Sequence, residues 1–296
     1  MKTLIVIPTR NRPNEIVNTI NFLKLNKNFF SKIIIVDSSD IELKEKIKKS
    51  LLNYNLNIKL IDAQPSTCTQ RNLGFSFIKD EQFIMFLDDD NIFYNDAFFQ
   101  INDFLKKNID FAGVAFNQIL KEKNSFSEKL KKNFITNKLN IYPSQKGGFS
   151  RSGWQSKFIN FEKDTVVEWL PTRAVIYKTE FTKNIRFDEN LGIYGYLEDL
   201  DFSLELKKRG KLFVCGNAKY THDKSIDRSD FNFGKKEVRN RYYLVKKHHL
   251  NKFLFFITLL AKIFSNLKEG LFLSNNSLQR FYGNIVALLT LNKLEK

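Results

Sequence analysis

Short apolar runs alternate with amphipathic stretches between residues 4 and 90, and this alternation constrains the fold more than any other feature of the chain. The stretches between the runs carry apolar residues at helical spacing. Four runs are typical of strands that are buried on both faces, and they lie at residues 4–7, 33–36, 58–61 and 83–87. Strands and helices in this order predict βαβ units and therefore a parallel sheet.

The pattern changes after residue 117. Residues 118–165 are polar and Lys-rich without clear periodicity, so we interpret them as a variable insertion. Ordered patterns then return, and from residue 235 onward they are helical. In between we predict a helix that begins within Gly195–Asp201 and ends at Lys208, and strands at Val166–Leu170, Ala174–Tyr177 and Leu212–Cys215, with a separate short strand that ends at His222.

The composition is that of an ordinary globular protein, with 43% hydrophobic and 27% charged residues. The longest apolar run, Phe253–Ala261, has about half of the roughly 20 residues that a membrane-spanning helix needs. The two cysteines cannot form a disulfide framework, and the apolar N-terminus is too short for the core of a signal peptide. We therefore expect a cytosolic protein. Its net charge of +16 favours anionic partners, which are phosphorylated small molecules, nucleic acid or an anionic membrane surface.

Polar residues follow three of the predicted strands, at Thr9-Arg10, at Asp37 and at Asp88-Asp89-Asp90. In parallel sheets, ligands bind at this carboxyl edge. Asp88 and Asp90 project to the same side of an extended chain, so they are able to share one divalent ion, and oxygen ligands suit Mg²⁺ or Mn²⁺. The alternative is structural: Asp89 or Asp90 would cap a helix that begins near Asn95.

A second acidic group, Glu198 and Asp199 with Asp201, lies in the loop that opens this predicted helix. Carboxylates stabilise the positive end of a helix dipole, which is one explanation for them. The other is that Asp199 acts as a general base on a hydroxyl. His222 closes a predicted strand, and its imidazole either completes a metal site or is structural.

Six motifs follow one another along the chain, namely Ile5–Arg12, Ile34–Asp40, Gln70–Gly74, Phe86–Asp90, Phe187–Glu189 with Glu198–Leu204, and Ala218–His222. In type and order they resemble the motifs of the inverting GT-A glycosyltransferases of family 2, of the bacterial surface-polysaccharide type. The resemblance covers about residues 4–250. It implies a Rossmann-like α/β fold with a mixed, mainly parallel sheet flanked by helices.

The resemblance also implies roles on the donor side of the site. Asp37 would accept a hydrogen bond from the nucleobase, in a pocket shaped by Pro8, Thr9 and Arg10. Arg71 would lie near the nucleotide, where a permanent positive charge suits phosphates. Asp88, with Asp89 beside it, would hold the ribose or a water on the metal. Asp90 and His222 would bind the metal, Mn²⁺ or Mg²⁺.

On the acceptor side, the resemblance makes Asp199 the catalytic base. Glu198 beside it would raise the pKa of Asp199 by like-charge repulsion. Trp169 and Arg173 would line the sugar and acceptor site. Residues 38 and 39 are Ser where many relatives carry Asp and Gly, and Arg173 stands in a turn that is often Gly-rich. Arg173 therefore either meets an anionic sugar or acceptor, or is an ordinary exposed Arg.

From the resemblance we expect a GT-A domain at residues 1–233 and a basic helical extension at 234–296. Within the domain, residues 1–117 would bind the nucleotide, 118–165 would be the insertion, and 166–233 would hold the acceptor and catalytic half. The predicted reaction moves a hexosyl or N-acetylhexosaminyl group from a UDP-sugar to a saccharide or lipid-linked saccharide, in synthesis of a cell-envelope polysaccharide. The C-terminal helices would either dock on the inner face of the cytoplasmic membrane or pack as core or as a dimer interface.

Two other functions compete with this prediction. A nucleotidyltransferase also places carboxylates and a metal at strand ends, but it would want a Gly-rich loop after the first strand, which residues 8–12 lack. A nucleic-acid-binding protein would explain the basic charge and the aromatic residues. It would not explain the two acidic groups, so no specific nucleic-acid partner is expected.

Overall fold

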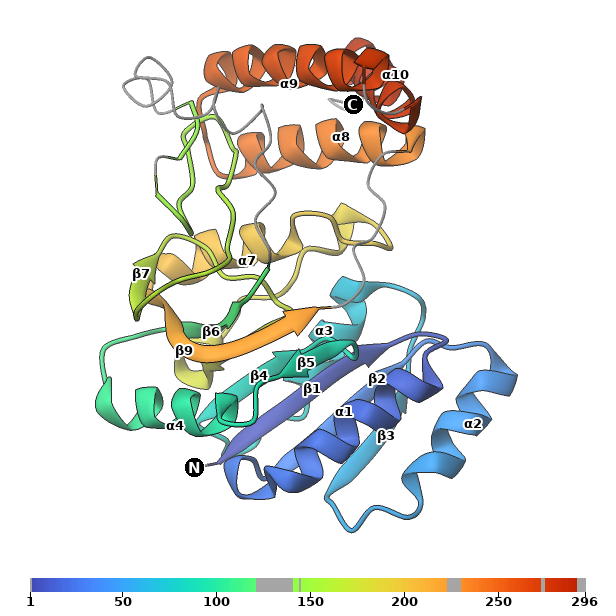
Figure 1. Cartoon of the computed structure of the whole chain (residues 1–296), viewed down its shortest axis with the longest axis vertical. Coiled ribbons are helices and arrows are strands. Elements are labelled where there is room, and N and C mark those ends of the chain that lie inside the picture. The colour runs from blue at the N-terminus through green and yellow to red at the C-terminus, as the bar shows by residue number, and fades with distance from the viewer. Residues whose placement is uncertain (1, 121–140, 144, 223–229, 273–274, 292–296) are drawn as a thin grey trace. The chain divides into compact units, whose positions relative to one another are not determined.

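The computed structural model describes residues 2–120, 141–143, 145–222, 230–272 and 275–291. The chain divides into two compact units, and Figure 1 labels the helices and strands of each. Unit 1 consists of residues 1–121 and 158–224, and unit 2 of residues 122–157 and 225–296. The predicted insertion at 118–165 lies partly outside the described residues. The division into domains at 1–233 and 234–296 stays a prediction.

Unit 1 is a mixed α/β unit, as the sequence predicted. Its strands form one sheet in the order β3-β2-β1-β4-β8-β6-β9-β5, with β7 paired to β9. The strands are β1 (Thr3–Thr9), β2 (Lys32–Asp37), β3 (Ile58–Asp62), β4 (Phe83–Leu87), β5 (Asn91–Phe93), β6 (Gly113–Gln118), β7 (Thr165–Val167), β8 (Ala174–Lys178) and β9 (Leu212–His222). The helices are α1 (Pro13–Leu25), α2 (Ile41–Leu51), α3 (Thr67–Phe75), α4 (Ala97–Lys107) and α7 (Glu198–Lys207), with short 3-10 turns at Lys27–Phe29, Thr179–Thr182 and Glu189–Leu191.

The first half of the sheet is parallel, because α1, α2 and α3 connect its strands. β1 pairs with β2 and with β4, and β2 pairs with β3, all in parallel. The register sets Thr9 opposite Asp37 at the carboxyl edge. This half carries the site residues that follow β1, β2 and β4.

The second half of the sheet is mostly antiparallel. β8 pairs with β4 and β6 in the antiparallel sense, β6 pairs with β9 in parallel, and β5 and β7 pair antiparallel with β9. The prediction of two separate strands between residues 212 and 222 was wrong, because β9 is one continuous strand. Between Phe116 and Asn117 of β6 the register on β9 shifts from Cys215 to Lys219, so the residues between these two form a bulge rather than an end.

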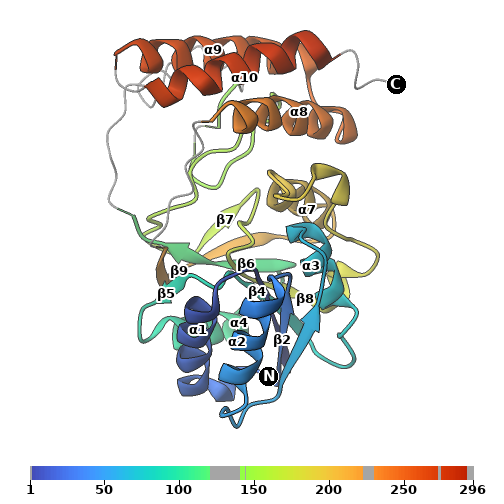
Figure 2. The same cartoon turned by 90° about the vertical axis from the view of Figure 1, so that its right-hand side faces the viewer.

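Side chains alternate across the strands, so each face of the sheet packs against different helices. Ile5 and Ile7 of β1 belong to a core with Ile16 and Ile20 of α1 and further residues of α2 and α4. On the opposite face the ring of Phe75 in α3 meets Phe86 of β4 edge to face and stacks on Phe202 of α7. Figure 2 shows α1, α2 and α4 on one side of the sheet and α3 and α7 on the other.

The approach of α3 to the sheet depends on Gly74. A Cβ at this position would lie only 2.5 Å and 2.7 Å from the two Cγ atoms of Val6 in β1. Glycine therefore allows the backbone of α3 to approach the central strand, and the same helix carries Gln70 and Arg71 over the carboxyl edge.

The described residues of unit 2 include three helices, α8 (Phe231–Lys247), α9 (Lys252–Phe272) and α10 (Asn275–Thr290). They share a hydrophobic core with Trp154, over which the buried guanidinium of Arg241 lies at 4.5 Å. Beside the core, Arg280 donates two hydrogen bonds to the carboxylate of the buried Glu237. In the described part of the chain, no helix combines the length and the apolar character needed to cross a membrane.

Candidate active site

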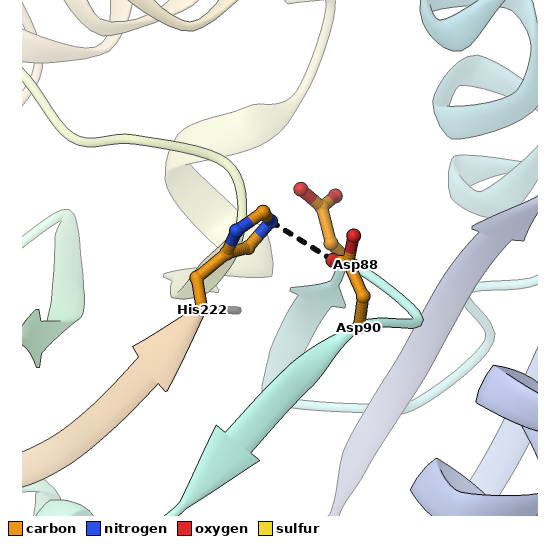
Figure 3. Close-up of side chains that lie close together, drawn as sticks. All are labelled: Asp88, Asp90 and His222. Atoms are coloured by element: carbon orange, nitrogen blue, oxygen red, sulfur yellow. Dashed lines mark ion pairs between the residues drawn. The ribbon is translucent and has the colours of Figure 1, made fainter. Parts of the chain in front are cut away.

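The candidate site lies at the carboxyl edge of the parallel strands. Asp88 and Asp90 follow β4, and His222 is the last residue of β9. The antiparallel pairing of β5 with β9 sets Asn91 opposite His222, which brings the imidazole next to Asp90. One donor atom from each of Asp88, Asp90 and His222 lies within 4.8 Å of the others (Figure 3).

This cluster fits a divalent cation. The Nε2 atom of His222 lies 2.9 Å from Oδ1 of Asp90, yet this buried oxygen has no hydrogen-bond partner among the described residues. Carboxylate oxygens and one imidazole nitrogen form a donor set that Mn²⁺ accepts and that Mg²⁺ accepts less readily, since Mg²⁺ prefers oxygen. The sequence predicted this grouping. The competing explanation, a cap for a helix near Asn95, is wrong, because α4 begins at Ala97 after Asp96.

Arg12 holds the other side of the acidic motif, and sequence reasoning missed it. Its Nη1 atom donates to Oδ1 of Asp89 and to Oδ2 of Asp90, each at 2.8 Å. Thr9 donates its hydroxyl to the remaining oxygen of Asp89 at 2.6 Å. Burial raises the pKa of Asp89 to about 6 in spite of these contacts. Burial also acts to raise the pKa of Asp90, but His222 and Arg12 outweigh it and the net shift is downward. Both carboxylate oxygens of Asp89 thus accept hydrogen bonds from the protein, and its role toward the nucleotide stays a prediction.

The predicted nucleobase pocket is built around Asp37, which is fully buried. Its Oδ1 atom accepts hydrogen bonds from the backbone and the hydroxyl of Ser39. Its Oδ2 atom is buried without a hydrogen-bond partner among the residues described. Gln70, which the sequence analysis did not single out, donates to the carbonyls of Thr9 and Val36 and ties α3 to β1 and β2. Pro8 lies in the same strand end, and Arg10 is exposed.

Arg71 lies between two carboxylates from distant parts of unit 1. Its Nη1 atom donates to Oε1 of Glu198 at 2.6 Å, and its Nη2 atom donates to Oδ1 of Asp88 at 3.1 Å. Thr172 also donates to Oε1 of Glu198, at 3.1 Å. Burial alone would lower the pKa of Arg71, but the two carboxylates reverse the shift. Arg71 therefore joins the acidic motif after β4 to the start of α7.

Helix α7 begins with Glu198 and with Asp199, the predicted catalytic base. Leu197 precedes it with a φ of 75°, in the left-handed region, and this turn begins the helix at Glu198. Burial raises the pKa of Glu198, and the charge of Asp199 adds to the shift. The rise in the pKa of Asp199 that the sequence analysis expected stays a prediction. One carboxylate oxygen of Asp199 accepts from the backbone of Leu200 at 2.8 Å.

The connection from β7 to β8 contains Trp169 and Arg173. The carbonyl of Arg173 accepts from the backbone N–H of Asp88 at 2.8 Å, and its guanidinium donates to Gln118 at 3.2 Å. Trp169 is buried against Phe158, and its indole N–H has no partner within the described part of the chain. Arg173 thus lies beside the acidic motif, while the roles of both residues toward a sugar or acceptor stay predictions.

A mixed sheet with this acidic motif at its parallel edge is the arrangement of the GT-A glycosyltransferases. The chain belongs to glycosyl transferase family 2, whose model matches residues 4–164, more than half of its length. The predicted resemblance to the GT-A glycosyltransferases of family 2 is confirmed, while the inverting mechanism and the surface-polysaccharide type stay predictions. No curated protein matches the chain in sequence.

Solved structures share the fold at low sequence identity. TarS from S. aureus is 16% identical, with a TM-score of 0.56 over 98% of this chain and 80% of that one. A mannosyltransferase from Pyrobaculum calidifontis, crystallised with GDP-Man and Mn²⁺, is 11% identical, with a TM-score of 0.58 over 97% of this chain and 86% of that one. GalNAc-T7, crystallised with UDP, GalNAc and Mn²⁺, is 14% identical, with a TM-score of 0.62 over 83% of this chain and 48% of that one.

Proposed function

We propose that the protein is a metal-dependent inverting glycosyltransferase that takes its sugar, a hexosyl or N-acetylhexosaminyl group, from a UDP-sugar. The observation that carries the proposal is the cluster of Asp88, Asp90 and His222, in which one buried oxygen of Asp90 has no hydrogen-bond partner among the residues that the structure describes. Family membership supports glycosyl transfer over the nucleotidyltransferase and nucleic-acid-binding alternatives. A further crystal structure of TarS contains UDP-GlcNAc, which supports a nucleotide-sugar donor for this chain.

On the donor side, Asp90 and His222 would hold Mn²⁺ or Mg²⁺, with Arg12 fixing the second oxygen of Asp90. A divalent cation bound there would neutralise charge on the departing nucleoside diphosphate. The Oδ2 atom of Asp37, which has no hydrogen-bond partner in the described part of the chain, would accept from the nucleobase beside Pro8, Thr9 and Arg10. Asp88 and Asp89 would complete the nucleotide site.

On the acceptor side, Asp199 would take the proton from the attacking hydroxyl. The hydroxyl oxygen would then bond to the anomeric carbon from the face opposite the departing diphosphate, so that the configuration inverts. Glu198, Trp169 and Arg173 would bind the sugar and the acceptor. We propose a saccharide or lipid-linked saccharide acceptor in synthesis of a cell-envelope polysaccharide, with the enzyme in the cytoplasm and docked at the inner face of the membrane.

The donor site is tested by thermal unfolding of the wild type and of Asp90→Asn with UDP and GDP, each with and without Mn²⁺. A ligand at 100 times its Kd stabilises the folded state by about 2.7 kcal/mol. We expect a shift with UDP that needs Mn²⁺ and is lost in Asp90→Asn. Asp96→Asn, an exposed aspartate of the same unit, is the matched control and should keep the shift. A wild type that responds to neither nucleotide refutes the proposal.

The base is tested by hydrolysis of UDP-GlcNAc, in which water replaces the acceptor. Asp199→Asn should keep the UDP-induced thermal shift but lose about 10²- to 10⁴-fold in rate, the usual contribution of a general base. Asp96→Asn again serves as the control. A hydrolysis rate that is the same in Asp199→Asn and in the wild type rules out this assignment.

A further inference from the structure

Helix α9 of unit 2 carries an apolar face that no described residue of the unit covers. Its members recur at intervals of three, four or seven residues and so lie along one side of the helix. We name them the α9 stripe: Phe253, Phe256, Ile257, Leu260, Phe264 and Leu271, all exposed.

The α9 stripe is not needed for the core of unit 2. The adjacent side of α9 supplies Phe255, Leu259 and Ile263 to the hydrophobic cluster with α8 and α10. A continuous apolar surface of this kind is uncommon on a protein that binds nothing there. The stripe therefore indicates a partner, and the charge of the unit identifies its kind.

Unit 2 is strongly basic. Its described residues include thirteen Lys and Arg against three Asp and Glu, a net charge of +10 out of +16 for the chain. On α9 itself, Lys252 and Lys268 are exposed beside the stripe, and their long side chains can extend to an anionic surface while the stem stays in apolar contact. Glu269, the one acidic residue of α9, lies off the stripe, because it follows Phe264 by five residues. Two copies of such a unit repel each other, whereas an anionic leaflet attracts them.

We infer that the α9 stripe docks on an anionic lipid leaflet, with α9 lying in the plane of the interface. Aromatic and aliphatic side chains on one face and lysines at its margin are the composition of helices that bind membranes in this way. The choice of a membrane rests in part on the proposed function, since a lipid-linked acceptor is presented at that surface. The surface itself is a property of unit 2 alone.

The test is co-sedimentation of the full chain with vesicles of equal parts phosphatidylglycerol and phosphatidylcholine, and with vesicles of phosphatidylcholine alone. We expect binding to the anionic vesicles that weakens at high salt. Phe264→Gln should weaken it about tenfold, the effect of withdrawing one large apolar side chain from the interface. The matched control is Phe99→Gln on α4, because the two phenylalanines are 69% and 62% exposed. This control should bind like the wild type. Leu260→Gln should repeat the loss.

Three outcomes would overturn the inference: no binding to anionic vesicles, equal binding by Phe264→Gln and the wild type, or a dimer in solution that Phe264→Gln dissociates. The last would make the stripe an interface between copies of the chain. The UDP-induced thermal shift, measured on the same preparations, keeps the two proposals apart. Vesicle binding without the UDP-induced shift contradicts the proposed donor site. The UDP-induced shift without vesicle binding contradicts the inferred docking of the α9 stripe on lipid.

Discussion

Arg71 makes the sharpest test of the site, because one buried guanidinium is bonded to two carboxylates. Its side chain is 4% exposed, while those of Glu198 and Asp88 are 13% and 24% exposed. The replacement Arg71→Met keeps most of the volume but removes the charge and its hydrogen bonds. Both carboxylates would then remain largely buried with the main cation between them missing.

The expected cost follows from the partners left behind. Breaking a buried ion pair by removing one partner costs about 3 to 5 kcal/mol, because the remaining charge is uncompensated. We expect about 3 kcal/mol here, since Asp88 keeps some contact with water. In a unit of this size, 1 kcal/mol shifts the Tm by roughly 2–4 °C, so the Tm of unit 1 should fall by about 6–12 °C.

The assay is thermal unfolding of Arg71→Met, Glu198→Gln and the double variant, without ligand. The double variant should be less destabilised than the two single effects added together, by at least about 1 kcal/mol, because Glu198→Gln removes one of the stranded charges. Arg10→Met, at an exposed arginine, is the control and should change little. If Arg71→Met has the same Tm as Arg10→Met and only its thermal shift with UDP is smaller, then Arg71 binds the nucleotide and its ion pairs with Glu198 and Asp88 do not stabilise the fold.

Two further predictions concern packing and pH. Gly74→Ala should destabilise unit 1 by about 1–3 kcal/mol, since its Cβ would overlap Val6; thermal unfolding checks this, and Val6→Ala in the same chain should restore part of the loss. In unit 2, burial alone would raise the pKa of Glu237, but Arg280 and neighbouring cations lower it from 4.5 to about 2. Its contribution of about 3 kcal/mol is therefore complete above pH 4.5 and is lost as the pH falls toward 2. Acid unfolding of the wild type against Glu237→Gln measures it, and identical pH curves would contradict it.

The sequence predicted the parallel half of the sheet closely, because each strand there is a continuous apolar run between amphipathic helices. The observed bounds of β1, β2 and β4 agree within a few residues with the apolar runs that predicted these strands. The antiparallel half was harder to predict. β5 is only three residues long, and it exists because it pairs with β9, a partner far along the chain. The bulge in β9 has the same origin, since the side chain of Asn117 donates to the carbonyl of Gly216.

In the site too, residues marked by a local sequence pattern were predicted, and contacts between distant parts of the chain were not. The grouping of Asp88, Asp90 and His222 was predictable, because acidic residues at a strand end and a lone histidine at another are visible in the sequence. Arg12 was not singled out, although it follows β1 by three residues and immediately precedes Pro13 at the start of α1. That position beside the carboxyl edge was the available signal. The pairing of Arg71 with Glu198 depends on the fold, since 127 positions separate them.

The ion pairs of Arg71 with Glu198 and Asp88 have a consequence for redesign. An engineer who exchanges the second half of unit 1 with that of a relative, to test the proposal that this half binds the acceptor, also replaces residue 198. A relative with a neutral residue there would leave Arg71 with Asp88 alone and so disturb the acidic motif after β4, which the exchange never touched. The smallest transferable cassette is therefore discontinuous: it holds the segment around residue 198 together with position 71.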